Sequence, residues 1–131
     1  MIVVDASVLA SALGDDGRDG HIARRELRSQ DIAIPDLADV ETVSVWRKRW
    51  LAGDIGPRRF RAAIDDLIEF AARRYPALPF MARAYQLRAN ATPYDAVYVA
   101  LAEELGCSLL TLDARLARAP GPRCPIRVLS N

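Results

Sequence analysis

The chain has 131 residues, of which 51% are apolar and 27% charged, a composition typical of a folded globular protein rather than a disordered one. We expect one domain over residues 1–131, because a single hydrophobic core serves chains of about 100–200 residues. The formal charge of +1 excludes a chain-wide basic or acidic field, although residues 41–90 carry ten bases and only five acids. Function must therefore depend on the positions of individual residues.

Export, membrane insertion and thiol chemistry are not indicated by the sequence. No run approaches the 20 or so apolar residues of a membrane span, and the apolar segment 2–13 has no basic leader, so we expect a cytoplasmic protein. Cys107 and Cys124 form no CxxC pair and make no zinc site by themselves. The only histidine, His21, lies among polar residues, which indicates a solvated side chain and argues against a catalytic triad.

The first part of the chain alternates short strands with helices. Residues 2–4 form a β-branched run that suits a strand buried on both faces of a parallel sheet. A helix over 6–13 follows, and Asp19 is expected to cap a second helix that reaches about residue 29. A second strand is predicted over 32–34, where Pro35 stops it.

Two longer helices come next. Asp36 is expected to be the N-cap of a helix that ends at Leu51, with Asp39 at the spacing of a capping box. Pro57 opens another amphipathic helix, at the position that proline favours, and this helix extends to Ala71.

The remaining segments complete an alternating pattern. A turn is predicted over 75–79, with a weak edge strand beside it, and a helix over 80–89. Thr92 is a strong N-cap for a helix that is apolar around its whole circumference and ends at Gly106, so this helix should be central and buried. Strands over 108–112 and 126–129 flank a short helix over 114–119. The pattern predicts an α/β domain with a parallel sheet.

Two acids follow predicted strands directly. Asp5 comes after the first strand and Asp113 after the strand that begins at residue 108. Ligands of open parallel sheets bind beyond the carboxyl ends of the strands, so these carboxylates should converge there if their strands are neighbours. Capping of the helices that follow explains each acid equally well.

Two further acids lie on helices. Asp95 shares a helix face with Val99 in the helix predicted to be buried, although an acid at this position also completes a capping box. Glu41 lies between Leu37 and Val45 on the helical wheel, an unusual place for a solvated side chain, and the alternative is a surface glutamate at an apolar boundary.

The four acids together favour a cation site. Gathered at one rim, Asp5, Glu41, Asp95 and Asp113 would repel one another unless a cation balanced them. Mg²⁺ or Mn²⁺ prefers such oxygen ligands, needs one or two carboxylates and keeps several waters. A site of this kind lowers the pKa of a bound water and clamps the oxygens of a phosphodiester.

Three stretches resemble a known family. Residues 2–13 (IVVDASVLASAL), 36–48 (DLADVETVSVWRK) and 92–119 (TPYDAVYVALAEELGCSLLTLDARLARA) are similar to the motifs of PIN-domain ribonucleases, and most similar to VapC-type toxins of toxin–antitoxin pairs. The resemblance implies a three-layer α/β/α sandwich and a Mg²⁺- or Mn²⁺-dependent endoribonuclease that forms homodimers. It also implies a cognate antitoxin, whose tail covers the acidic groove. The family's four metal-site acids match Asp5, Glu41, Asp95 and Asp113, and its small hydroxyl residues match Ser7 and Thr111.

The sequence patterns that suggest contacts with RNA and with the antitoxin are less specific than the pattern of the four acids. The basic middle third offers candidate phosphate contacts, although a solvated helix surface is the favoured interpretation, at Arg47, Lys48, Arg49, Arg58, Arg59 and Arg61. Tyr94 is a candidate for base stacking, but burial in the core is the favoured interpretation. Trp46 and Trp50, one turn apart, are a candidate partner contact, and core packing is again favoured.

Three other functions fit the sequence less well. A receiver-type signalling module needs a lysine late in the chain, but the only lysine is Lys48. A phosphatase of the haloacid dehalogenase type needs acids two residues apart, but Ser7 follows Asp5 at that distance. A purely structural interaction protein would tolerate asparagine at all four acids.

Overall fold

A computed structural model describes residues 1–130, and its centre is a five-stranded sheet in the order β3-β2-β1-β4-β5. All neighbouring strands run parallel, so their carboxyl ends share one edge of the sheet. The strands are β1 (Ile2–Val4), β2 (Ile32–Pro35), β3 (Arg73–Tyr75), β4 (Ser108–Thr111) and β5 (Ile126–Val128). All the predicted strands are present, including the weak edge strand before the 75–79 turn, although β2 includes Pro35 and β4 and β5 each end one residue earlier than predicted.

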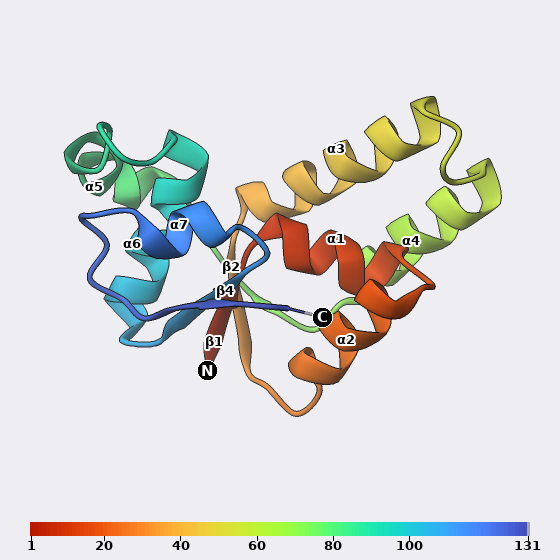
Figure 1. The fold of residues 1–131 in the computed structure, drawn as a ribbon, viewed down its shortest axis with the longest axis horizontal. Helices are drawn as coiled ribbons and strands as arrows, with labels where there is room; N and C mark the ends of the chain where they lie inside the picture. The colour runs from red at the N-terminus through yellow and green to blue at the C-terminus, as the bar shows by residue number, and fades with distance from the viewer. Residues whose placement is uncertain (131) are drawn as a thin grey trace.

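Helices cover both faces of the sheet, as Figure 1 shows, with α1 to α4 on one side and α5 and α6 on the other. Their bounds are α1 (Ala6–Gly14), α2 (Arg18–Leu27), α3 (Leu37–Leu51), α4 (Pro57–Glu69), α5 (Met81–Gln86), α6 (Pro93–Leu105) and α7 (Ala114–Arg118), with a 3₁₀ turn, η1, at Leu78–Phe80. The predicted three-layer α/β/α sandwich is confirmed.

The core lies between the central strands and the helices on either side. Helix α6 is buried from Ala96 to Ala102, as its apolar circumference predicts, and packs against β1, β2 and β4. Thr92 caps this helix by accepting a hydrogen bond from the Asp95 N–H, and Gly106 ends it in the left-handed conformation. Because both ends are fixed, the first turn of α6 is held at the carboxyl edge of the sheet.

Trp46 joins α3 to α1. Its side chain is fully buried, and its indole N–H donates to the Ala10 carbonyl at 3.1 Å. A Cβ at Gly14 would lie 2.1 Å from the indole nitrogen, so only glycine permits this approach. Core packing is therefore confirmed for Trp46, whereas Trp50 is 43% exposed. This contact between α3 and α1 fixes the position of α3 over the sheet edge, and therefore the position of Glu41.

The predicted capping box of α3 is wrong. The Asp36 carboxylate makes no cap bond to its own helix but accepts from the Ala77 N–H at 3.2 Å. Asp39 instead pairs with Arg74 of β3, with its Oδ2 2.8 Å from Nε. The edge strand β3 lies beside β2 and brings Arg74 to Asp39, while the turn that follows β3 brings the Ala77 N–H to Asp36.

Other predicted boundaries also shift. Helix α2 begins at Arg18 after Gly17, not after a cap at Asp19, because the Asp15 carboxylate binds the Gly17 N–H at 2.7 Å and sets the turn. The single helix predicted over 80–89 is instead η1 followed by α5, with hydrogen-bonded turns after Gln86. Helix α4 ends at Glu69 rather than Ala71, since the chain becomes extended at Phe70.

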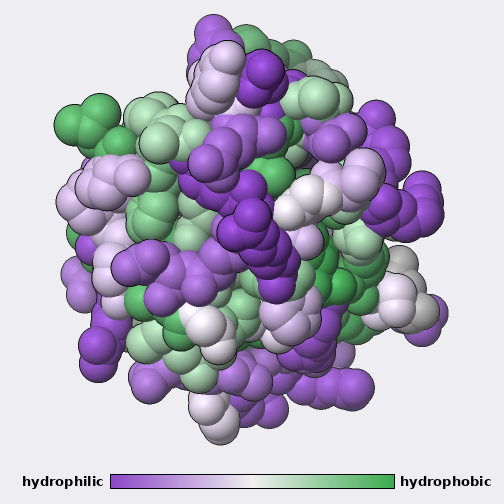
Figure 2. All heavy atoms as spheres, turned by 90° about the vertical axis from the view of Figure 1, so that its left-hand side faces the viewer, coloured by the Kyte–Doolittle hydropathy of each residue, from purple (hydrophilic) through white to green (hydrophobic). Residues whose placement is uncertain are grey.

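Figure 2 views the molecule from the side of α5 and α6, where polar side chains cover much of the surface and apolar side chains lie between them. The exposed apolar side chains of this layer include Leu78, Met81 and Tyr85. Within residues 1–130, no helix combines the length and apolar character needed to cross a bilayer.

Candidate active site

Four acids from four elements line one cleft of about 480 Å³ at the carboxyl edge of the sheet. Asp5 follows β1, Glu41 lies in the second turn of α3, Asp95 in the first turn of α6, and Asp113 follows β4. The elements that carry them meet near the centre of Figure 1. The structure thus brings together all four acids that the sequence predicted to converge.

Asp5 is the most deeply held of the four, with 7% of the residue exposed. One carboxylate oxygen accepts from the Ser7 hydroxyl at 2.5 Å and the Val8 N–H at 3.2 Å, and the other accepts from the Thr111 hydroxyl at 2.5 Å. Burial raises the pKa of Asp5 above its ordinary value, while these hydrogen bonds act in the opposite direction. Asp5 therefore caps α1 and faces the cleft at the same time.

The two hydroxyls also connect Asp5 to the end of β4. Thr111 Oγ1 accepts from the Asp113 N–H at 3.0 Å, and Ser7 Oγ accepts from the Leu112 N–H at 3.2 Å. Asp113 in turn caps α7 through the Arg115 N–H at 2.9 Å. Capping and a place in the cleft are not alternatives for either acid.

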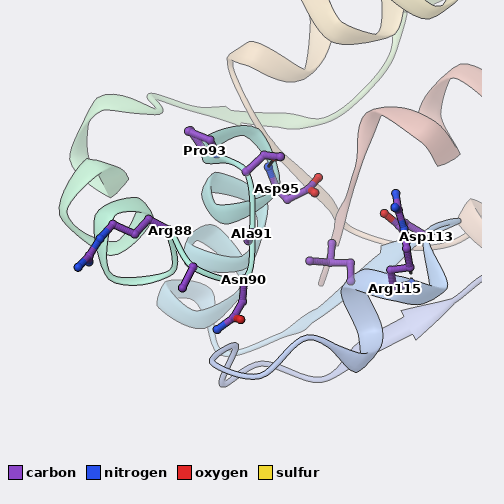
Figure 3. Close-up of a pocket in the computed structure, with 10 residues that line it drawn as sticks. Arg88, Asn90, Ala91, Pro93, Asp95, Asp113 and Arg115 are labelled. Carbon is purple, nitrogen blue, oxygen red and sulfur yellow. Dashed lines mark hydrogen bonds and ion pairs between the residues drawn. The ribbon is translucent and has the colours of Figure 1, made fainter.

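Asp95 is half-buried at the start of α6. Burial is the main reason that its pKa is raised, and the negative charges of Asp5 and Asp113 raise it further. In Figure 3, the side chains of Asp95 and Asp113 point toward each other. The local electrostatics therefore favour either a bound proton or a bound cation at Asp95.

Glu41 receives a hydrogen bond that the sequence analysis did not predict. The Tyr98 hydroxyl donates to its Oε1 at 2.7 Å. Burial raises the pKa of Glu41, and the charges of Asp95 and Asp5 add to the effect, while the Tyr98 bond lowers it. Tyr98 lies three residues after Asp95 on the same face of α6, and this spacing is the sequence signal that identifies it.

The predicted basic residues lie outside this cleft. Among them, Arg59 binds Asp16 and the Leu13 carbonyl, each at 2.9 Å, and Arg49 donates to the Gly14 carbonyl at 3.0 Å. The arginine beside the acids is one that the sequence analysis did not single out: Arg115, whose Nε lies 3.5 Å from Asp113 Oδ1. The expectation that Tyr94 is buried is wrong, because 59% of this residue is exposed at the outer side of the first turn of α6.

The donor set fits a hydrated hard cation. All four side chains offer carboxylate oxygens, the ligands that Mg²⁺ and Mn²⁺ prefer. Within residues 1–130, no three His, Cys, Asp or Glu side chains approach closely enough to hold one ion together. Mg²⁺ needs only one or two carboxylates and completes its shell with water, so this spacing suits it better than a metal held by protein ligands alone.

The comparisons with known proteins agree with this architecture. The family model described as "PIN domain" matches residues 2–122. VapC ribonuclease Mb0985 of Mycobacterium bovis is 39% identical over 129 residues, which cover 98% of each chain. Ribonuclease VapC1 of Mycobacterium tuberculosis is 40% identical over 128 residues, 97% of this chain and 96% of that one.

A solved structure gives the same fold. The crystal structure of Mycobacterium tuberculosis VapC20, described as a sarcin-ricin loop cleaving toxin, superimposes with a TM-score of 0.71 at 17% identity and covers 90% of this chain and 94% of the other. At this identity the superposition supports the fold alone. The family model and the two ribonuclease relatives show that the chain belongs to the PIN-domain family and, within it, to the VapC group.

Proposed function

We propose that this protein is a metal-dependent endoribonuclease, the toxin of a toxin–antitoxin pair, and that residues 1–131 act as one PIN domain in the cytoplasm. The observation that carries the proposal is the meeting of Asp5, Glu41, Asp95 and Asp113 in one cleft. The names of the VapC relatives support the RNA substrate and the reaction class. No observation favours the receiver-type module as an alternative.

In this proposal the four carboxylates bind Mg²⁺ and position its water, and Mn²⁺ can replace Mg²⁺. Asp5, Asp95 and Asp113 would hold the hydrated ion between them, with one or two of these carboxylates as direct ligands and bound water completing the shell. Glu41 would bind a second ion or orient the attacking water. The bound metal would supply an activated water and neutralise charge that develops on the phosphate. Ser7 and Thr111 hold Asp5 in its orientation, as their hydrogen bonds to both of its oxygens support.

Cleavage of total RNA tests the activity. We expect the purified protein to cut RNA with Mg²⁺ and to stop when EDTA removes the metal. Asp5→Asn and Asp95→Asn should abolish cutting while the fold remains, whereas the control Asp65→Asn, on the exposed side of α4, should cut normally. Wild-type rates in both cleft variants would refute the assignment of the site.

We propose further that a cognate antitoxin binds this chain and that the chain forms a homodimer. Trp50 supports a partner contact, because it lies with Phe60 and Ile64 in an apolar hollow of about 270 Å³. Trp50→Ser should weaken antitoxin binding while RNA cleavage continues.

The phosphate contacts proposed for Arg47, Lys48, Arg58 and Arg59 predict a loss of RNA affinity when Arg58 and Arg59 are replaced.

A further inference from the structure

A second pocket opens directly beside the cleft of the four acids. It measures about 540 Å³, and Asp95 and Asp113 line both spaces. Figure 3 shows it between the segment that leads into α6 and the start of α7. We call it the α6–α7 pocket; it is lined by residues 88–93, Asp95, Asp113, Arg115 and Leu116. A ligand that extends past the carboxylates of Asp95 and Asp113 can therefore reach this pocket.

The lining combines an apolar surface with a few polar groups. Ala91, Pro93 and Leu116 supply the apolar part. Asn90 is exposed in this lining, so its side-chain amide is accessible to a ligand. An amide both donates and accepts, so it can pair with the edge of a nucleobase. Small-molecule and nucleotide sites are typically built in this way.

Arg115 supplies the positive charge. Its side chain is 87% exposed, and its ion pair with Asp113 is long, at 3.5 Å. Exposed pairs of this kind are weak, so the guanidinium is available to an incoming phosphate. Arg88, the other arginine of the lining, is occupied elsewhere: it donates to the Tyr85 carbonyl at 2.9 Å and lies 3.9 Å over the Tyr85 ring. Figure 3 shows Arg88 directed away from Asp95.

We propose that the α6–α7 pocket is a nucleotide subsite for the RNA substrate, and this inference rests on the proposed function. Arg115 binds the phosphate that neighbours the cleaved phosphate in the RNA chain. Asn90 contacts the base of the nucleotide that lies between these two phosphates. The pocket adjoins the catalytic acids, so its occupant is the nucleotide beside the cut. Proteins read single-stranded RNA by taking unstacked bases into pockets of this kind.

The test of Asn90 compares cleavage positions in an RNA pool with randomised sequence. Asn90→Leu removes the amide and should weaken the base preference at one position beside the cut by on the order of fivefold, the effect of one hydrogen bond. Asn90→Gln keeps the amide and should retain part of the preference. The overall extent of cleavage reports on folding, because a misfolded variant would lose cleavage of every sequence equally.

Arg115 is tested by the salt dependence of RNA binding. Fluorescence anisotropy of a labelled single-stranded RNA is measured in the Asp5→Asn background, in which the RNA stays intact. Arg115→Gln should weaken binding several-fold and reduce the slope of log affinity against log salt by about 0.7, the share of one phosphate contact. Arg118→Gln is the matched control, because Arg118 is exposed on the same helix but outside the pocket.

Each result separates the subsite from the ribonuclease activity. If the wild-type protein cuts RNA but Asn90→Leu gives the same cleavage profile, and Arg115→Gln binds like Arg118→Gln, the subsite is refuted while the activity stands. If these variants cut normally but lose antitoxin binding, the occupant is a protein segment and the inference is again refuted. Failure of the wild-type protein to cut any RNA would refute the proposed function itself.

Discussion

The hydroxyl of Tyr98 lies 2.7 Å from the carboxylate of Glu41, although 57 residues separate the two in the chain. The bond crosses from α6 to α3. Because Tyr98 and Asp95 share one helix, this hydrogen bond also fixes the position of Glu41 relative to Asp95. Tyr98 is itself almost fully buried and is therefore a rigid support. We consider it a positioning residue, since it acts through Glu41.

Tyr98→Phe should keep the packing but remove the donor. Without this hydrogen bond the pKa of Glu41 rises further, so the acid limb of the pH–rate profile should move to higher pH. We expect the cleavage rate at neutral pH to fall about three- to tenfold, in line with the loss of one hydrogen bond. The profile is measured as kcat/KM between pH 5.5 and 8.5. Tyr85→Phe, on the exposed side of α5, should leave the profile unchanged, and an unshifted profile for Tyr98→Phe would contradict the positioning role.

Metal binding should stabilise the fold. Mg²⁺ or Mn²⁺ binds the folded cleft and not the unfolded chain, so saturating metal should raise the free energy of unfolding by about 2.7 kcal/mol at a hundred times the dissociation constant. Thermal unfolding with and without EDTA measures the shift in Tm. Asp5→Asn should lose most of the shift, whereas Asp65→Asn should keep it. Equal shifts in wild type and Asp5→Asn would show that the ion binds elsewhere.

Without metal, the clustered acids should destabilise the fold at neutral pH. Burial and neighbouring charge raise the pKa of Asp95 above its unfolded value, so its protonated form is favoured in the fold. The resulting stability is complete below the unfolded pKa and is lost as the pH rises through the folded one. In EDTA, Asp95→Asn should therefore melt above the wild type at pH 7–8, and the difference should shrink toward pH 4.

Asp16 provides a control of opposite sign. Its pKa is lowered by its hydrogen bond and ion pair with Arg59, so its stabilising effect is present above the unfolded pKa and disappears as the pH falls through the folded one. Asp16→Asn should not melt above the wild type at any pH. If Asp95→Asn melts below the wild type at pH 8 in EDTA, the description of a repulsive metal-free cleft is wrong.

An ion pair links α5 to α6 in the helical layer on the other side of the sheet from α1–α4. Arg83 of α5 binds Glu103 of α6 through two hydrogen bonds of 2.8 and 3.0 Å, and the side chains are only 18% and 16% exposed. Glu103 also accepts from the Arg123 N–H at 2.7 Å, which ties the loop before β5 to α6. These bonds to Arg83, with its charge, lower the pKa of Glu103.

Glu103→Gln should therefore lower the free energy of unfolding by about 1–2 kcal/mol at pH 7, because it leaves the partly buried guanidinium of Arg83 without its countercharge. The lowered pKa means that the effect is present above the unfolded value of 4.5 and is lost as the pH falls through the folded value. Urea unfolding at pH 7 and pH 3 measures both. Asp65→Asn breaks the exposed pair with Arg61 and should change little.

Local chemistry was sufficient to predict most of the fold. The β-branched run of β1, the Thr92 cap with Pro93 and the glycine at the end of α6 act within a few residues, so they can be recognised in the sequence. The placement of Asp5 and Asp113 directly after strands is local in the same sense. Their convergence followed from the parallel order of the sheet, in which β1 and β4 are neighbours.

The side-chain partners were decided by the tertiary structure alone. Asp36 and Asp39 had the spacing of a capping box, yet the edge strand and the turn after it gave them Arg74 and Ala77 as partners. The Tyr98–Glu41 bond and the α6–α7 pocket likewise depend on how α3, α6 and α7 pack over one sheet edge. Sequence patterns determine which residues face inward and where each element ends, but a contact across tens of residues depends on packing angles and register, which no local pattern encodes.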